Sequence, residues 1–125
     1  MSDYKKPYKV FFYKTAAGNM PVKAYLDDLR QSNNPNDLRI YQDVLAYIEM
    51  LSMKGNTLGT PYIKKLHGTE LWELRPRSER VIYCMIEGNT VYLLHAFTKK
   101  SQKTPKKEID TAMIRYKQLL RIVCL

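Results

Sequence analysis

The sequence predicts a single α+β domain over residues 1–125, with its elements in the order β-α-α-β-β-β-α. Apolar residues recur at helical spacing in two stretches near the N-terminus and in one at the C-terminus. Short runs rich in β-branched and aromatic residues occupy the rest of the chain, and a glycine turn joins two of them closely. These observations indicate an antiparallel meander sheet packed with an N-terminal helical pair and a C-terminal helix. With 45% hydrophobic residues, the chain can bury a real core.

The opening elements are a strand and two helices. Residues 9–14, KVFFYK, form the strand. Asn19 can cap a first helix that has Pro21 near its start and ends in the polar segment SNNPND. A second helix follows over residues 37–53 and stops at Gly55-Asn56. The first apolar stripe is Val22, Tyr25, Leu26 and Leu29, and the second is Leu38, Tyr41, Leu45 and Ile48, widened by Val44 and Leu51.

Three strands and a last helix make up the second half. The strands cover residues 71–75, 80–87 and 91–97, and the helix covers residues 105–121. A loop at residues 77–79 joins the first two strands, and Gly88-Asn89 forms a two-residue hairpin turn. This pairing places two sets of side chains on opposite faces of the sheet. The core set is Trp72, Leu74, Ile82, Cys84, Ile86 and Leu93, and the more polar set is Glu73, Arg75, Val81 and Tyr83.

Positive charge concentrates after the last strand. Residues 94–109, LHAFTKKSQKTPKKEI, contain five lysines before the first acidic residue. Thr104-Pro105 indicates an N-cap and a first helical position, so Lys106 and Lys107 fall in the first turn of a helix. A cation there forgoes roughly 0.3 to 1 kcal/mol that an acidic side chain would gain from the helix dipole. Lysines at this unfavourable helix position, with no visible compensation, indicate a function for the lysine-rich segment. The alternative is that the segment is simply a solvated surface.

The overall charge favours a polyanionic partner. Lys and Arg number 21 against 12 Asp and Glu, which gives a net charge of +9 that attracts phosphate and nucleic acid. A membrane surface or an acidic protein would also satisfy the charge alone. The start, MSDYKKPYK, has no apolar run long enough for a signal peptide, and no segment approaches the roughly 20 residues of a spanning helix. We therefore expect a cytoplasmic protein with no membrane partner.

Chemistry without a metal or cofactor fits this composition. The sequence has no phosphate-cradling glycine loop, no G-x-S-x-G and no H-E-x-x-H. The spacing of His67, His95, Cys84 and Cys124 matches no metal site, and we expect free thiols. Guanidinium and ammonium groups suit holding a phosphodiester and neutralising the charge that develops on it during cleavage. RNA supplies its own nucleophile, the 2′-hydroxyl, so a metal-free basic site could suffice.

Each candidate also has a structural alternative. Arg75 and Arg80 could simply pair with Glu73 and Glu79 in exposed ion pairs. His67, in the loop KLHGTE, is exposed enough to transfer a proton but has no identified partner. Three further residues are expected to be structural rather than functional, because they lie in strands among apolar neighbours: Trp72, His95 and Cys84.

Two strings, KKLHGTELWELRPRSERVIY and VYLLHAFTKKSQKTPKKEI, resemble the HigB-like branch of the RelE/ParE toxin superfamily. The shared features are K-L-x-G, a W/Y-E-L-R strand, an R-V-x-Y strand and an L-H-x-F-x-K-K-x-x-K-T-P signature. The resemblance covers residues 62–112 strongly. It implies a RelE-like fold and a toxin of a type II toxin–antitoxin system that cleaves messenger RNA, often on the translating ribosome. It also implies a cognate antitoxin, commonly a helix-turn-helix DNA-binding protein.

The resemblance assigns roles to individual residues. Arg80 would brace the scissile phosphate with support from Arg75, and Lys99 and Lys100 match the basic pair that holds phosphate. The general acid and base stay open among Glu73, His67 and a lysine of depressed pKa, because the RelE branch carries lysines where this chain has Leu71 and Glu73. The predicted catalytic residues are Arg75, Arg80, Lys100 and Glu73, and the predicted RNA-binding residues are Lys99, Lys103, Lys106, Lys107 and Arg77.

Two rival functions stay open at this point. The same superfamily includes toxins that poison DNA gyrase, and a fold does not fix a function. A degenerate member that only binds its antitoxin or operator would share the same features.

Overall fold

The computed structural model describes residues 6–123, so Cys124 and the first five residues of the N-terminal segment lie outside the described part. The α+β class and the predicted order of elements are confirmed, with one additional short strand, β2. The elements are β1 (Lys9–Phe12), α1 (Pro21–Gln31), α2 (Pro35–Lys54), the 3-10 helix η1 (Gly55–Leu58), β2 (Ile63–Lys65), β3 (Trp72–Leu74), β4 (Glu79–Ile86), β5 (Thr90–Thr98) and α3 (Lys106–Val123).

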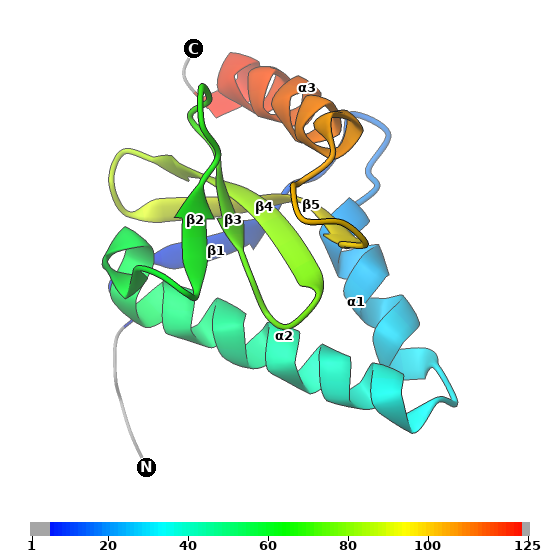
Figure 1. The fold of residues 1–125 in the computed structure, drawn as a ribbon. Helices are drawn as coiled ribbons and strands as arrows, with labels where there is room; N and C mark the ends of the chain where they lie inside the picture. The colour runs from blue at the N-terminus through cyan, green and yellow to red at the C-terminus, as the bar shows by residue number, and fades with distance from the viewer. Residues whose placement is uncertain (1–5, 124–125) are drawn as a thin grey trace.

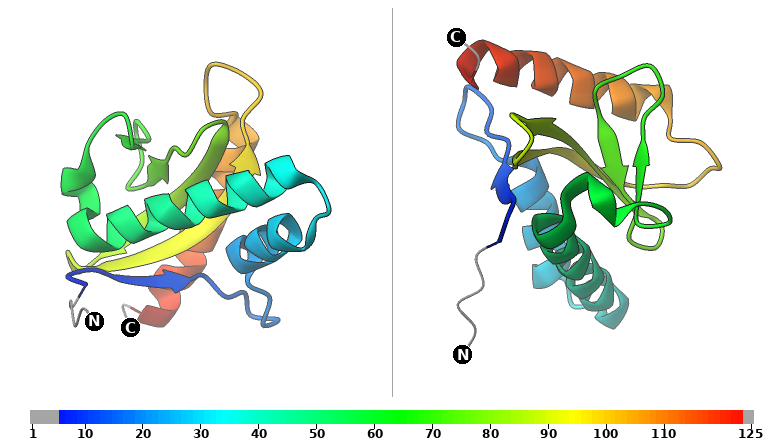
Figure 2. Two further views of the ribbon diagram at one scale, coloured as in Figure 1. Left: turned by 90° about the horizontal axis from the view of Figure 1, so that it is seen from below. Right: turned by 90° about the vertical axis from the view of Figure 1, so that its left-hand side faces the viewer.

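The five strands form one sheet in the order β1-β5-β4-β3-β2. Strands β3 to β5 are the predicted antiparallel meander. Strand β2 extends it beside β3, and β1 adds to β5 in parallel at the opposite edge. Helices α1 and α2 cover one face of this sheet and α3 covers the other (Figures 1 and 2). The result is a three-layer arrangement.

Two hydrophobic cores follow from these layers. Val22, Leu51 and Leu74 belong to the core beneath α1 and α2. Ile82 and Ala112 belong to the core beneath α3. Because both faces are covered, all of the first six residues of β4 are buried. No open polar face is therefore left in the middle of the sheet.

The predicted division of side chains between the two faces was wrong by one residue. The loop between β3 and β4 covers residues 75–78, so Trp72 pairs with Tyr83 and Leu74 pairs with Val81. These four side chains share the face of α1 and α2, whereas Glu73 pairs with Ile82 on the other face. Tyr83 is fully buried rather than part of a polar surface.

The turn between β4 and β5 also differs from the prediction. Its central residues are Glu87 and Gly88, with φ values of 53° and 79°, and Asn89 N–H donates to the Ile86 carbonyl at 3.4 Å. Two left-handed residues define a type I′ turn. This shift puts Leu93 opposite Tyr83 instead of on the face of Cys84 and Ile86. A register shift follows between Ile82 and Tyr83, and Ile82 pairs with His95.

The helices begin close to their predicted starts, with different caps. The N-cap of α1 is Met20 rather than Asn19. Helix α2 starts at Pro35, where the Asn34 side chain accepts a hydrogen bond from the Asn36 N–H at 2.8 Å. Helix α3 starts at Lys106, which confirms that Lys106 and Lys107 lie in its first turn. The Thr104 hydroxyl donates to the Glu73 carboxylate, and at the start of α3 the Glu108 N–H donates to the Pro105 carbonyl at 3.1 Å.

The buried stripe of α2 is rotated from the predicted one. Val44 and Leu51 are fully buried, whereas Leu38 and Leu45 are 44% and 39% exposed. Apolar residues surround much of this helix, so periodicity alone did not fix the centre of the stripe. No helix within residues 6–123 is long and apolar enough to cross a membrane.

Candidate functional site

The candidate site lies where β3 ends, β4 begins and β5 leaves the sheet. We call residues 99–105, which join β5 to α3, the lysine loop (Figure 1). The Lys99 N–H donates to the Ser78 carbonyl at 2.7 Å, which ties the start of this loop to the loop between β3 and β4. The two basic segments predicted from the sequence are therefore neighbours.

Glu73 and two arginines form the centre of the site. Glu73 pairs with Ile82, and since side chains alternate along a strand, Arg75 and Arg80 are directed to the same face as Glu73. The Glu73 Oε2 atom is 3.5 Å from Arg75 Nε and 3.9 Å from Arg80 Nε. The Thr104 hydroxyl donates to Glu73 Oε1 at 2.6 Å. Only 3% of the Glu73 side chain is exposed.

Two backbone carbonyl groups hold the guanidinium group of Arg80 in place. Its Nη1 donates to the carbonyls of Arg77 at 2.8 Å and Glu79 at 2.7 Å. Only 8% of its side chain is exposed, and neither Arg80 Nε nor Arg75 Nε has a hydrogen-bond partner. Burial, and then the charge of Arg75, lower the pKa of Arg80, yet a guanidinium stays protonated in proteins. Arg80 is buried and Arg75 is partly buried, and two incompletely paired cations of this kind suit an anionic ligand.

Two lysines extend this positive region. Desolvation, and then the charges of Arg80 and Arg75, lower the pKa of Lys99, and Lys64 contributes a smaller repulsion. Lys64 lies directly opposite Glu73 in the pairing of β2 with β3, so it is directed to the same face. Sequence reasoning missed Lys64 because the three-residue strand β2 carries no periodic signal.

A pocket of about 440 Å³ opens beside Arg80. Hydroxyl and amide groups line it together with the cations, which suits a phosphate that needs several hydrogen-bond donors. The lining residues are Arg77, Ser78, Arg80, Lys99, Lys100, Ser101 and Gln102. A second pocket of about 410 Å³ continues past Lys100 and Ser101 to Lys107 and Glu108.

The other predicted residues are less central. Arg77 reaches the pocket, but its Nε also donates to Asp43 of α2. Lys106 is directed to Asp110, one turn along α3, at 2.8 Å. Lys103 is exposed on the lysine loop. The structure thus gathers Arg75, Arg80 and Glu73 with Lys99 and Lys100 nearby, and it does not bring Lys106 to them.

Glu79 does not pair with an arginine as one structural alternative supposed. Its Oε1 accepts hydrogen bonds from the hydroxyls of Tyr25 and Thr98, the latter at 3.0 Å. Glu73 is the acid group that faces both arginines. The arginines therefore pair with a glutamate, as the structural alternative expects, and they also form the cluster of cations that the functional prediction expects.

His95 has a structural role. Its Nε2 is 2.7 Å from Glu108 Oε1, and Arg115 Nη1 lies 3.1 Å from its Nδ1. These contacts tie β5 to the first and third turns of α3. His67 is exposed in the loop between β2 and β3.

Trp72 and Cys84 also fit the structural expectation. Trp72 is half-buried against the core beneath α1 and α2. Cys84 is a fully buried free thiol, and burial raises its pKa to about 12. Within residues 6–123, no three His, Cys, Asp or Glu side chains form a group that could hold a metal ion.

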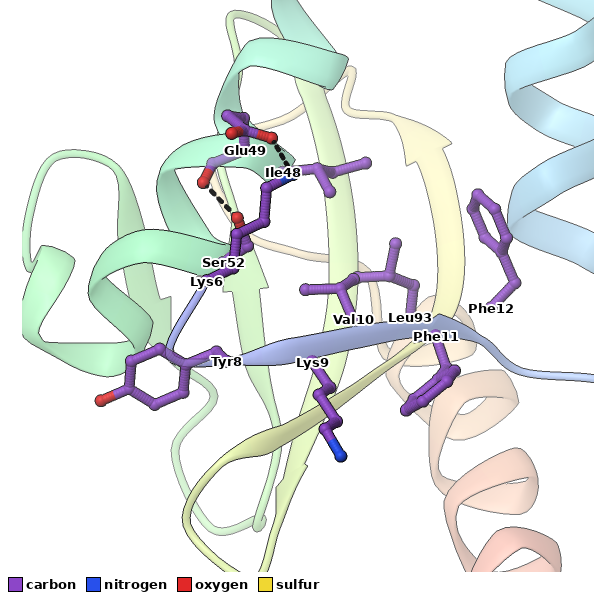
Figure 3. A pocket seen from close by; sticks show the side chains of 10 residues that line it. All are labelled: Lys6, Tyr8, Lys9, Val10, Phe11, Phe12, Ile48, Glu49, Ser52 and Leu93. Atoms are coloured by element: carbon purple, nitrogen blue, oxygen red, sulfur yellow. Dashed lines mark hydrogen bonds and ion pairs between the residues drawn. The ribbon is translucent and has the colours of Figure 1, made fainter. Parts of the chain in front are cut away.

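Another pocket, of about 510 Å³, lies along the edge strand β1 and the C-terminal part of α2 (Figure 3). Val10, Phe12 and Leu93 contribute apolar surface, and Lys6 there is paired with Glu49 at 2.6 Å. This pocket brings no unpaired arginine to its wall. It is therefore not the phosphate site that the sequence predicts.

Comparison with solved structures identifies the class of fold. The chain is similar to a structure described as "Chromosomal ParDE TA system from P. aeruginosa", with a TM-score of 0.50 and 14% sequence identity. The similarity covers 77% of this chain and 100% of that chain. It shows the RelE-like fold that the sequence predicts.

Sequence comparison identifies the family. The model of the family described as "Phage derived protein Gp49-like (DUF891)" matches residues 26–117. The chain belongs to this family, which is part of the RelE/ParE-like toxin superfamily. The match does not single out the HigB-like branch. A search of curated proteins finds no match.

Proposed function

We propose that this protein is the toxin of a type II toxin–antitoxin system and that it cleaves messenger RNA in the manner of the RelE and HigB toxins, without a metal ion or cofactor. The observation that carries the proposal is Arg80, a buried guanidinium with an unpaired Nε beside a pocket that Lys99 and Lys100 also line. Membership of a toxin superfamily supports it.

The reaction suits this set of residues. The RNA 2′-oxygen bonds to phosphorus, the bond from phosphorus to the 5′-oxygen breaks, and the products are a 2′,3′-cyclic phosphate and a free 5′-hydroxyl. Negative charge builds up on the phosphate oxygens in the transition state, where Arg80 and Arg75 stabilise it. Lys99 and Lys100 hold the phosphate in place from the lysine loop.

Proton transfer remains to be assigned among the open candidates. Both carboxylate oxygens of Glu73 are engaged by neighbours, which leaves it poorly placed to take a proton from RNA. Lys99 lines the pocket beside Arg80 and its pKa is lowered, so we assign to its ammonium group the proton that the departing 5′-oxygen gains, while the 2′-hydroxyl gives its proton to water. Replacing Lys99 by Arg keeps the charge but should lose cleavage while RNA binding persists; unchanged cleavage rules out this assignment.

The partners follow from the same charges. A ribosome is a dense polyanion, and a chain with net charge +9 gains affinity for it that weakens with salt. We expect the protein to act in the cytoplasm on ribosome-bound mRNA. We also expect a cognate antitoxin, of the helix-turn-helix type, that neutralises the basic surface.

Expression of the chain alone in a bacterial host tests the proposal. We expect growth arrest and new RNA ends clustered within open reading frames soon after induction. The double variant Arg80→Ala with Lys100→Ala should abolish both. Arg80→Lys serves as a milder second variant, because Ala leaves the carbonyls of Arg77 and Glu79 without their donor. Persistent cleavage by a double variant with an unchanged circular dichroism spectrum would refute the site.

A control variant that loses two cations outside the site distinguishes the effect of net charge from the effect of where the charges lie. Lys54, at the end of α2, and Arg121, near the end of α3, are exposed, and replacing both by Ala removes the same net charge. This control should arrest growth as the wild type does.

The rival function is inhibition of DNA gyrase. The fold shared with a component of a ParDE system favours it as the second candidate. Intact transcripts together with DNA damage after induction would support the rival. Normal growth, with neither effect, would indicate a member that only binds its antitoxin or operator.

A further inference from the structure

Thr104 makes a contact that the proposed chemistry does not use. It lies near the end of the lysine loop, and its hydroxyl reaches across to the buried carboxylate of Glu73, 31 residues earlier in the chain. The start of the loop is held by the hydrogen bond from Lys99 N–H to the Ser78 carbonyl. The loop is thus fastened at both ends, while Lys100 and Lys103 between these points are exposed.

Glu73 contacts both Thr104 of the lysine loop and the two arginines of the site. One of its oxygens accepts from Thr104, and the other faces Arg75 and Arg80. Two guanidinium groups repel each other, so a carboxylate between them sets their separation. At 3% exposure, Glu73 offers almost no surface to a substrate. It acts on the site through its neighbours.

We propose that Thr104 and Glu73 form a latch that positions the lysine loop over the arginine pair. Both are positioning residues, and neither touches the RNA. The latch fixes Lys99 and Lys100 relative to Arg75 and Arg80, so that one phosphate meets both sets of cations. Its effect on cleavage rests on the proposed function, whereas its effect on the loop does not.

Replacing Thr104 by Val keeps the shape of the side chain and removes the hydroxyl. Glu73 Oε1 then loses its donor in a buried place, and the loop loses its attachment at that end. The loop should open more often, and the catalytic rate should fall about tenfold, in line with the loss of one hydrogen bond to a charged group. Thr104→Ser retains the hydroxyl and should restore both properties.

Trypsin reports on the loop directly, because it cuts after Lys99, Lys100 and Lys103 when the loop opens. We would compare the wild type, Thr104→Val and Thr104→Ser, and map the cuts by mass spectrometry. The matched control is Thr111→Val in α3, whose hydroxyl donates to the Lys107 carbonyl of its own helix at 3.0 Å. Urea midpoints would show that any faster cutting is local.

The same four proteins would be given messenger RNA bound to ribosomes, the proposed substrate, under single-turnover conditions. We expect Thr104→Val to be cut by trypsin about tenfold faster and to cleave RNA about tenfold more slowly, with Thr104→Ser and Thr111→Val close to the wild type. Equal tryptic rates for the wild type and Thr104→Val would overturn the latch, as would a Ser variant that behaves like Val. If the loop opens in Thr104→Val but the wild type cleaves no RNA, the latch stands and the nuclease function fails.

Discussion

Arg80 shows how a single residue can be fixed in place and still be ready for a ligand. Two backbone carbonyls hold its Nη1, and Glu73, 3.9 Å from its Nε, balances part of its charge without a hydrogen bond. A buried cation that is incompletely paired destabilises the free protein. An anion bound in the pocket beside Arg80, where Lys99 and Lys100 also lie, would offset this charge and should therefore stabilise the folded state.

We predict that inorganic phosphate stabilises the protein beyond its effect on ionic strength. Binding only to the folded state adds about 1.4 kcal/mol to the free energy of unfolding at a concentration about ten times the dissociation constant. The measurement is the thermal midpoint in phosphate against chloride at equal ionic strength. Arg80→Lys should lose the phosphate-specific part, because an ammonium cannot reproduce the planar fork of a guanidinium. Equal midpoints for the wild type in the two salts would contradict an anion site at Arg80.

At the scale of elements, the hairpin between β4 and β5 contains a correctable strain. Glu87 adopts φ 53°, in the left-handed region that an L-residue with a long side chain disfavours by roughly 1–2 kcal/mol. Asn tolerates this conformation better and is preferred before Gly in a type I′ turn. We predict that Glu87→Asn raises the free energy of unfolding by about 1 kcal/mol. Urea unfolding measures it, with Glu70→Asn, in an exposed loop, as the charge-matched control.

Loop length explains which parts of the sheet the sequence could predict. The four-residue loop at 75–78 and the turn at Glu87-Gly88 each differ by one residue from the predicted loops, and a one-residue slip exchanges the faces of a strand. Alternation could not correct the slip, because Val81, Ile82, Tyr83 and Cys84 are all fully buried in a sheet covered on both sides. The positions of β1, β3, β4 and β5 were predictable, whereas the short strand β2 and the register were not.

The same reasoning applies to the site. The residue chemistry and the family resemblance pointed to Arg75, Arg80 and Lys99, which the structure brings together. Sequence reasoning could not place Glu73 between the arginines or join it to Thr104, because that contact spans 31 residues and leaves no local pattern. Thr104 was instead predicted to cap α3, which is the usual role of a threonine before a helix.

At the scale of the whole molecule, the excess of positive charge is spread widely, while the candidate site occupies one end of the sheet. Exposed cations such as Lys54 of α2 and Arg121 of α3 lie outside the site residues. Long-range attraction depends on the net charge, whereas phosphate contact depends on position. The long-range attraction and the direct phosphate contacts can be distinguished by the salt dependence of binding, because only direct contacts release counterions from the bound segment of RNA.

We predict that the salt dependence of RNA binding locates the contacts. For a single strand, each neutralised phosphate contributes about −0.7 to the slope of log K against log salt. Lys100→Ala should therefore make the slope shallower by about 0.7 and weaken binding of an uncleavable 2′-deoxy oligonucleotide. Lys54→Ala removes the same charge from the end of α2 and should shift affinity slightly with no change of slope. Equal slopes for Lys100→Ala and the wild type would mean that Lys100 does not contact phosphate, which would contradict its place in the proposed site.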